Sequence, residues 1–416
     1  MPMTLRAMFL ALFTTLAVAA PAAAEPDVSD LVPAKPITIT KPPTGKIDNL
    51  FAVAPVPGGF LLTWARSTGS VPPFTLIAQK YTSTGVATGK SAIIDGPGTV
   101  GDVVVARVMK SGQIGLFWMR GGHVWAAKLD PATMVVSSKT DLGKSDDHIH
   151  DATVLANGNI AVITAQIDVS NPSAMRYKNS IKVVDASFKT VKPWASIHGN
   201  GFPLDGWAYL DQSIVAHAAG GLALYRDHVT NTIMGRNFST SGVQAASTVR
   251  INTTTMSKPY VSDLPYFRVE AARLTSGKLA VCWVSLEQTG LKRYEVRCRM
   301  TSSSGVPTGA DFLVHSSVDG GQTSPDVIAL PGDRFAVTWV HADVIYPNHV
   351  RHRVFDAAGK PVNVQRTGHS FTATDLTLPP LDTQAVALAD GSIAVVMNQS
   401  AFVPGLRAFG IAKPAN

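Results

Sequence analysis

The chain has 416 residues, 45% of them hydrophobic, and carries 36 Lys and Arg against 29 Asp and Glu, a net charge of +7. This modest charge, without any run of five or more basic residues, argues against dedicated nucleic-acid binding. No stretch approaches the ~18 apolar residues that a membrane-spanning helix needs, so we expect no transmembrane segment.

The first residues have the pattern of a secretory signal peptide. One arginine precedes an apolar run from Met8 to Ala20, and small residues follow up to Glu25. This pattern predicts a cleavable signal peptide over residues 1–24, and therefore a periplasmic or secreted protein. We expect residues 25–36 to be a proline-containing lead-in to the folded domain.

After this lead-in, one short pattern occurs seven times. Each copy has an apolar strand, a small polar turn that contains Gly, and a second apolar strand that often ends in an aromatic residue. Short apolar runs bounded by Gly, Pro, Asn, Asp and Ser indicate strands, and no long segment has the period of a helix. The copies span Phe51–Trp64, Ala106–Trp118, Asp151–Thr164, Ile214–Tyr225, Glu270–Trp283, Asp326–Trp339 and Gln384–Met397.

The spacing between the copies leaves room for four short strands in each repeat. A four-stranded unit cannot bury both of its faces alone, so neighbouring units must stack. We therefore predict an all-β fold, a seven-bladed β-propeller of four-stranded antiparallel blades that forms a single domain over residues 37–416. The seventh repeat lacks its fourth strand, and we expect Ile37–Thr40 to supply that strand and close the ring.

The chain has two cysteines, Cys282 and Cys298, in consecutive strands of the fifth repeat. Because an exported chain meets an oxidising compartment, we predict a cross-strand disulfide between them. The alternative is a pair of buried free thiols.

The sixth repeat contains the segments FAVTW and VRHRVFDAAGKPV, and the first and fifth repeats have a similar pattern. These segments resemble the tandem propeller repeats of secreted bacterial proteins, whose consensus runs like GGFVVTW followed by FDASGN. The resemblance implies a secreted propeller used for binding or scaffolding, and it brings no catalytic residues with it.

In four repeats a polar residue stands directly before the apolar run of the first strand. These slot residues are Asp151, Glu270, Asp326 and Gln384. Equivalent positions of a propeller converge at one end of the central channel, so we predict that the slot residues bind a ligand there. Carboxylates and an amide suit a cation or a basic or polyhydroxylated molecule. The alternative is that short polar residues simply begin strands beside solvent.

Two further groups are ligand candidates. His148 and His150 are two residues apart in an extended segment, so their rings lie on one side, and with Asp151 they could bind a divalent cation. His150 also belongs to the predicted channel end. Trp194 and Trp207 bracket a Gly-rich loop, in which aromatic rings could stack on a sugar.

Residues 317–323 read SVDGGQT, and Phe267–Glu270 reads FRVE. The first segment resembles the Asp-box of sialidase-type propellers, and the second resembles the FRIP motif of the same family. This resemblance implies that Arg268 binds a substrate carboxylate. Glu270 stands where the motif has proline, and seven repeats differ from the six blades of sialidases.

Motifs of serine hydrolases, zinc proteases, P-loop enzymes and dinucleotide-binding enzymes are absent from the sequence. The leading hypothesis is an exported, monomeric binding or interaction module that recognises a carbohydrate or another exported protein at one end of the channel. The first alternative is a glycosidase or polysaccharide lyase, with Glu270, Asp326 and Arg268 as candidate catalytic residues. The second alternative is a metal-dependent propeller that uses His148 and His150.

Overall fold

The computed structural model describes most of the chain beyond the predicted signal peptide, which lies outside the described residues. All regular structure in the described residues is β-strand, and none of them forms a helix that could cross a membrane. The predicted all-β class is confirmed. The described residues are 31–32, 37–40, 43, 47–67, 74–98, 100–145, 148–168, 176–197, 202–203, 212–227, 230–253, 256, 268–286, 294–316, 320–342, 349–370, 382–398 and 406–414.

The described strands form antiparallel sheets, and consecutive strands pair within each sheet. The first three sheets comprise β3 (Ile47–Val56), β4 (Gly59–Ser67), β5 (Phe74–Thr82) and β6 (Ala87–Gly98); β7 (Val100–Val108), β8 (Ile114–Arg120), β9 (His123–Leu129) and β10 (Thr140–Lys144); and β11 (His148–Val154), β12 (Ile160–Asp168), β13 (Arg176–Val184) and β14 (Thr190–Ser196), with β15 (Phe202–Pro203) also paired to β13.

Three more sheets follow the same four-stranded order, so the predicted four-stranded antiparallel unit is confirmed. They comprise β16 (Gln212–His217), β17 (Gly220–Asp227), β18 (Thr232–Ser239) and β19 (Val249–Arg250); β20 (Val269–Arg273), β21 (Leu279–Leu286), β22 (Tyr294–Thr301) and β23 (Pro307–Leu313); and β24 (Gly321–Leu330), β25 (Arg334–Ala342), β26 (His349–Asp356) and β27 (Arg366–Ser370).

The last sheet combines strands from both ends of the described chain. β28 (Asp382–Ala387), β29 (Ile393–Asn398) and β30 (Leu406–Pro414) pair in order, and two short N-terminal strands pair with β30. β2 (Ile37–Thr38) lies opposite Arg407 and Ala408, while β1 (Leu31–Val32) lies opposite Lys413 and Pro414. The segment expected to be a lead-in therefore also contributes a strand to this sheet.

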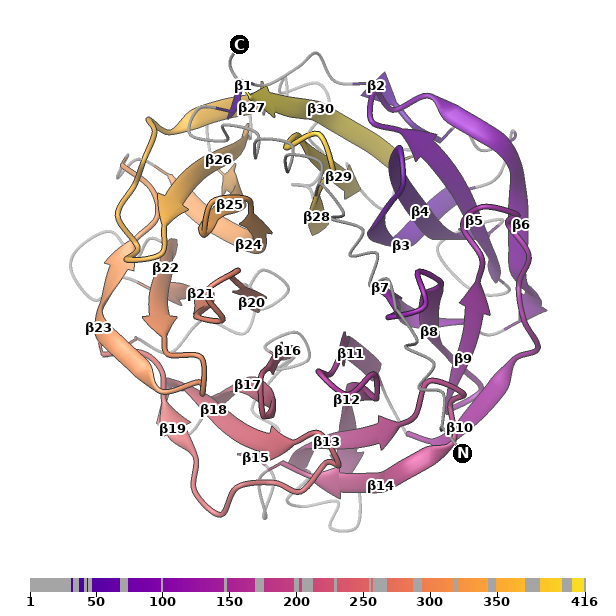
Figure 1. The fold of residues 1–416 in the computed structure, drawn as a ribbon, viewed down its shortest axis with the longest axis horizontal. Coiled ribbons are helices and arrows are strands. Elements are labelled where there is room, and N and C mark those ends of the chain that lie inside the picture. The colour runs from indigo at the N-terminus through magenta and orange to yellow at the C-terminus, as the bar shows by residue number, and fades with distance from the viewer. Residues whose placement is uncertain are drawn as a thin grey trace, which may run out of the picture.

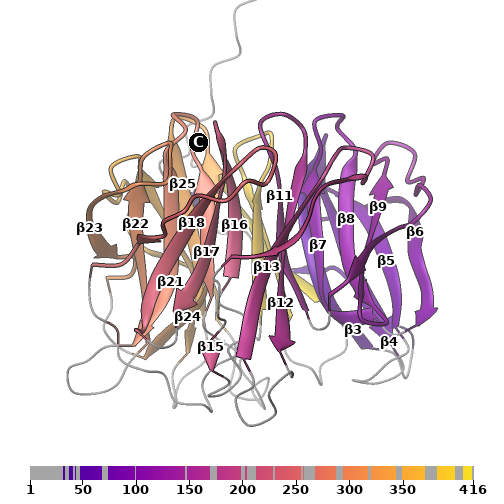
Figure 2. The same ribbon diagram turned by 90° about the horizontal axis from the view of Figure 1, so that it is seen from below.

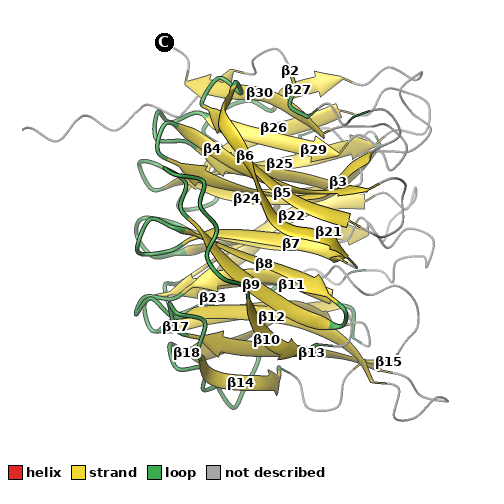
Figure 3. Ribbon diagram, turned by 90° about the vertical axis from the view of Figure 1, so that its right-hand side faces the viewer, coloured by secondary structure: helices red, strands yellow, loops and turns green. Residues whose placement is uncertain are grey.

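The sheets stand around a common centre, with the first strand of each sheet nearest to it (Figure 1). Each first strand contacts the first strand of the next sheet, and β28 contacts β3. Seen from the side, neighbouring sheets lie next to one another, and their strands run from one end of the molecule towards the other (Figure 2). Most of the described loops, drawn in green, lie at one end of the molecule (Figure 3).

The hydrophobic core is divided among the spaces between neighbouring sheets. Each large cluster of buried side chains draws on two neighbouring sheets, and one such cluster joins Val396 of the last sheet to Phe60 of the first. Tryptophans at or near the ends of second strands pack against the preceding sheet in four of these clusters. They are Trp64, Trp118, Trp283 and Trp339.

Cys282 of β21 and Cys298 of β22 lie directly opposite each other and form a disulfide. Both residues are fully buried between the fifth and sixth sheets. The bond closes a loop with a sequence separation of 16 residues. Loop closure of this length lowers the entropy of the unfolded chain and so stabilises the fold.

Replacing both cysteines by alanine should lower the free energy of unfolding by about 3 kcal/mol, because the unfolded chain regains the entropy of that loop. Denaturant unfolding of the oxidised protein and of the variant measures the difference. Dithiothreitol should destabilise the wild type and leave the variant unchanged, and equal sensitivity of both proteins would contradict a stabilising disulfide.

Candidate functional site

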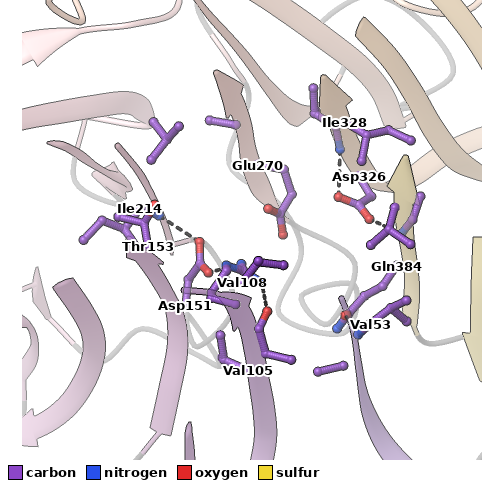
Figure 4. A pocket seen from close by; sticks show the side chains of 18 of the residues that line it. Val53, Val105, Val108, Asp151, Thr153, Ile214, Glu270, Asp326, Ile328 and Gln384 are labelled. Carbon is purple, nitrogen blue, oxygen red and sulfur yellow. Dashed lines mark hydrogen bonds and ion pairs between the residues drawn. The ribbon is translucent and has the colours of Figure 1, made fainter. Parts of the chain in front are cut away.

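A cavity of about 460 Å³ lies at the centre of the molecule, between the first strands of the sheets. Its lining includes residues of β3, β7, β11, β16, β20, β24 and β28 (Figure 4). Six of the residues singled out in the sequence line this one cavity, and they are His150, Asp151, Arg268, Glu270, Asp326 and Gln384.

Asp151 connects three neighbouring sheets. Its Oδ1 accepts hydrogen bonds from the Arg107 guanidinium of the second sheet and from the Ala152 N–H, the latter at 2.7 Å. Its Oδ2 accepts hydrogen bonds from the Ser213 hydroxyl and the Ile214 N–H of the fourth sheet, both at 3.0 Å. Arg107 strengthens the link by donating to the Ala152 carbonyl at 2.6 Å. Both carboxylate oxygens are therefore engaged within the protein.

Asp326 repeats this arrangement in the sixth sheet. Its Oδ1 accepts the N–H of Val327 at 2.8 Å, and its Oδ2 accepts the N–H of Ala385 in the last sheet. Ala385 and Ile214 occupy equivalent places, each directly after the slot position of its own sheet. The two aspartates thus accept the equivalent backbone N–H of the next sheet.

Gln384 makes the corresponding link between the last sheet and the first. Its Oε1 accepts the N–H of Val53 at 3.2 Å, and its Nε2 donates to the carbonyl of Phe51 at 2.9 Å. An amide can both accept and donate, which a carboxylate cannot. These bonds favour a structural role over ligand binding for Asp151, Asp326 and Gln384, because the three side chains form hydrogen bonds with the backbone of a neighbouring sheet.

Glu270 differs from the other slot residues. Its side chain is one methylene longer than that of aspartate, and its carboxylate projects into the cavity (Figure 4). Within the described residues its one ion pair is with Arg268, where Nη1 of Arg268 lies 3.9 Å from Oε1 of Glu270. The side chain is only 23% exposed. Burial raises the pKa of Glu270 well above 4.5, Arg268 opposes this shift, and Asp326 and Asp151 add to it. Glu270 therefore holds its proton to higher pH than an exposed glutamate.

Arg268 and His150 line the same cavity as Glu270. Arg268 precedes β20 and reaches the Thr383 carbonyl of the last sheet at 3.4 Å. His150 occupies a bulge of β11, and its Nε2 is buried without a hydrogen-bond partner in the described part of the chain. Burial, with smaller contributions from His148 and Arg268, lowers the pKa of His150 to about 3, so its ring is neutral at pH 7.

The residues expected to bind a metal do not form a compact ligand set. The ring centroids of His148 and His150 are 6.4 Å apart, and Asp151 already has hydrogen-bond donors on both oxygens. Within the described ranges, no group of three or more His, Cys, Asp and Glu is arranged to hold a metal ion.

Of the two tryptophans proposed for sugar stacking, Trp194 is described and does not line the cavity. Trp194 lies on β14, where it packs against the core between the second and third sheets, and Lys182 Nζ lies 5.7 Å from its ring centroid. Trp207 and Ser317–Asp319 of the Asp-box segment lie outside the described residues.

Three residues of the cavity region were not singled out in the sequence. Ser213 occupies the slot position of the fourth repeat, so alignment of all seven repeats identifies it. Arg107 and Arg273 line the cavity. The sequence feature that could have identified them is a basic residue inside an otherwise apolar first strand.

No family model and no curated protein matches this chain. Among solved structures, a protein of unknown function from Dyadobacter fermentans is 12% identical, with a TM-score of 0.50 over 77% of this chain and 97% of that one. A Penicillium chrysogenum α-L-arabinanase is 11% identical, with a TM-score of 0.49 over 91% and 98% of the two chains. A polysaccharide lyase of family PL25 is 11% identical, with a TM-score of 0.47 over 92% and 94%. At such identities the likeness concerns the fold and assigns no activity.

The raised pKa of Glu270 predicts a specific dependence of stability on pH. Because the fold raises this pKa above the value of 4.5 in the unfolded chain, the stability contributed by Glu270 is fully present below pH 4.5 and is lost as the pH rises. Glu270→Gln should remove this loss, so its stability relative to wild type should grow with pH, by at most about 1.4 kcal/mol per pH unit.

Denaturant unfolding at a series of pH values from about 4.5 to 8 measures this difference. Glu270→Ala also lacks the acid, so its curve should run parallel to that of Glu270→Gln, whatever its packing loss. Two variants with the pH dependence of the wild type would show that Glu270 is not a proton-retaining buried acid.

Proposed function

We propose that this chain is an exported, closed β-propeller of seven blades that binds a small polar ligand in its central cavity. The ring closure is supported by the contact between β28 and β3, by the core cluster shared by the last and first sheets, and by the Gln384 bonds across that junction. The pairing of β2 with β30 adds N-terminal residues to the last blade. Export rests on the predicted signal peptide.

The observation that carries the proposed binding function is the departure of Glu270 from the common role of the slot. Asp151, Asp326 and Gln384 are used to join neighbouring sheets. Glu270 instead projects into the cavity and pairs with Arg268 there. The Glu270 carboxyl is partly exposed, projects into the cavity and lies next to an arginine, so it can bond an incoming polar group. This arrangement supports a binding role for Glu270.

The cavity dimensions favour a small molecule. Its volume of about 460 Å³ falls within the range of roughly 300–1,000 Å³ typical of small-molecule sites. Arginine, histidine and carboxyl groups at one place suit a molecule with several oxygen atoms, and carbohydrates and their derivatives are the class we propose.

The same contacts favour binding over hydrolysis by a pair of carboxylates. Hydrolysis at this site would need Asp326 as the partner of Glu270. Both oxygens of Asp326 accept backbone N–H groups, and Asp151 makes the same bonds at its own position. This shared arrangement supports a structural role for Asp326.

A screen of sugars, sugar acids and other small polar metabolites by ligand-observed NMR tests the proposal. For a molecule that binds the wild type, Arg268→Ala and Glu270→Ala should each raise Kd by about 10-fold or more, because each removes a hydrogen bond to a charged or buried group. The melting temperature should not fall in Glu270→Ala.

Lys110→Ala is the matched control, because Lys110 bonds the Ala156 carbonyl through an exposed contact outside the cavity lining. It should bind the ligand as the wild type does. Binding that survives in both cavity variants would contradict the assignment of the site.

A further inference from the structure

Two polar side chains, Arg268 and Glu270, meet in the central cavity, and His150 also lines it. The Arg268 guanidinium lies 3.9 Å from the Glu270 carboxylate, and the His150 ring lines the same cavity with its buried Nε2 lacking a hydrogen-bond partner among the described residues. The charge of Arg268 influences both neighbours. An incoming group beside this ion pair can therefore contact both Arg268 and Glu270.

Arg268 and a protonated Glu270 can both donate hydrogen bonds. Arg268 has only donors, and a protonated Glu270 carboxyl has one O–H. Two adjacent donors match the lone pairs of a carboxylate or another oxyanion.

The charges of the cavity lining depend on the proton of Glu270. The other charged residues in the lining are Arg107, Arg268 and Arg273 against Asp151 and Asp326, so the lining has a net charge of 3 − 2 = +1 while Glu270 is protonated and His150 neutral. Ionisation of Glu270 cancels this charge and places a carboxylate against Arg268. A protonated Glu270 therefore leaves the cavity attractive to an anion, and an ionised one does not.

Both aspartates of the lining are engaged in bonds within the protein. Asp151 is paired with Arg107 and bonded to Ser213 and Ile214, and Asp326 is bonded to the backbone of two sheets. Burial favours the protonated form of Glu270 and the neutral form of His150. The proton that changes the charge of the cavity is thus the one on Glu270.

We propose that the cavity binds small oxyanions, carboxylates above all, and that each anion binds together with one proton on Glu270. This inference rests on the proposed binding function and adds the charge of the ligand and its linkage to pH. In the complex the anion accepts hydrogen bonds from Arg268 and from the Glu270 O–H. An ionised Glu270 would repel the anion and compete for Arg268.

Isothermal titration calorimetry with D-glucuronate, L-lactate and acetate tests the inference, with D-glucose as the neutral counterpart of glucuronate. At least one anion should bind the wild type at pH 5.5, and its affinity should fall by up to about tenfold per pH unit as Glu270 ionises. Titrations above this transition, in two buffers of different ionisation enthalpy, should show uptake of about one proton per anion bound.

The variant Glu270→Gln is permanently neutral and keeps a hydrogen-bond donor. It should bind the anion without proton uptake and with little dependence on pH over the same range. Arg268→Ala should lose anion binding at every pH.

The outcomes separate this inference from the proposed function. Binding of glucose alone, or of a neutral metabolite from the screen, would overturn the anion inference and leave the binding cavity standing. Failure of all three acids to bind at tens of millimolar would also overturn it. Anion binding by Glu270→Gln with the proton uptake of the wild type would show that another group holds the proton.

Discussion

The first strand of each sheet is an edge strand, and the rest of the structure depends on how its outward N–H groups are satisfied. A buried, unpaired N–H costs free energy, so an edge strand must be covered or bonded. Here the slot side chain of one sheet accepts the N–H of the next sheet, as Asp151, Asp326 and Gln384 do for Ile214, Ala385 and Val53. The same bonds hold the inner strands around the cavity.

Function is best sought where this common arrangement is broken. Glu270 occupies the slot of the fifth sheet, yet its longer side chain projects into the cavity and meets Arg268 there. This junction, like the others between neighbouring sheets, has a buried cluster, here around the Cys282–Cys298 pair and Trp339. Its packing does not require a bond from Glu270, and this carboxyl projects into the cavity.

The fold could be predicted from the sequence to a large extent, because strand periodicity and turn residues are local signals that recur in every repeat. The convergence of the slot residues also follows from the repeat. The partner of each side chain could not be predicted, because it depends on the twist between sheets and on bulges such as the one at His150. The side chains of Asp326 and Glu270 differ in length by one methylene and have different roles. The periodicity of the sequence carries no information about that difference.

The most direct test of this division of roles compares the free energies of unfolding of Asp326→Ala and Glu270→Ala at pH 7. The predicted result is a loss of about 1–3 kcal/mol for Asp326→Ala, because it leaves buried N–H groups of two sheets unpaired, and no loss for Glu270→Ala. Equal losses in the two variants, or a loss confined to Glu270→Ala, would contradict the assignment of Asp326 to the sheet junction and of Glu270 to the cavity.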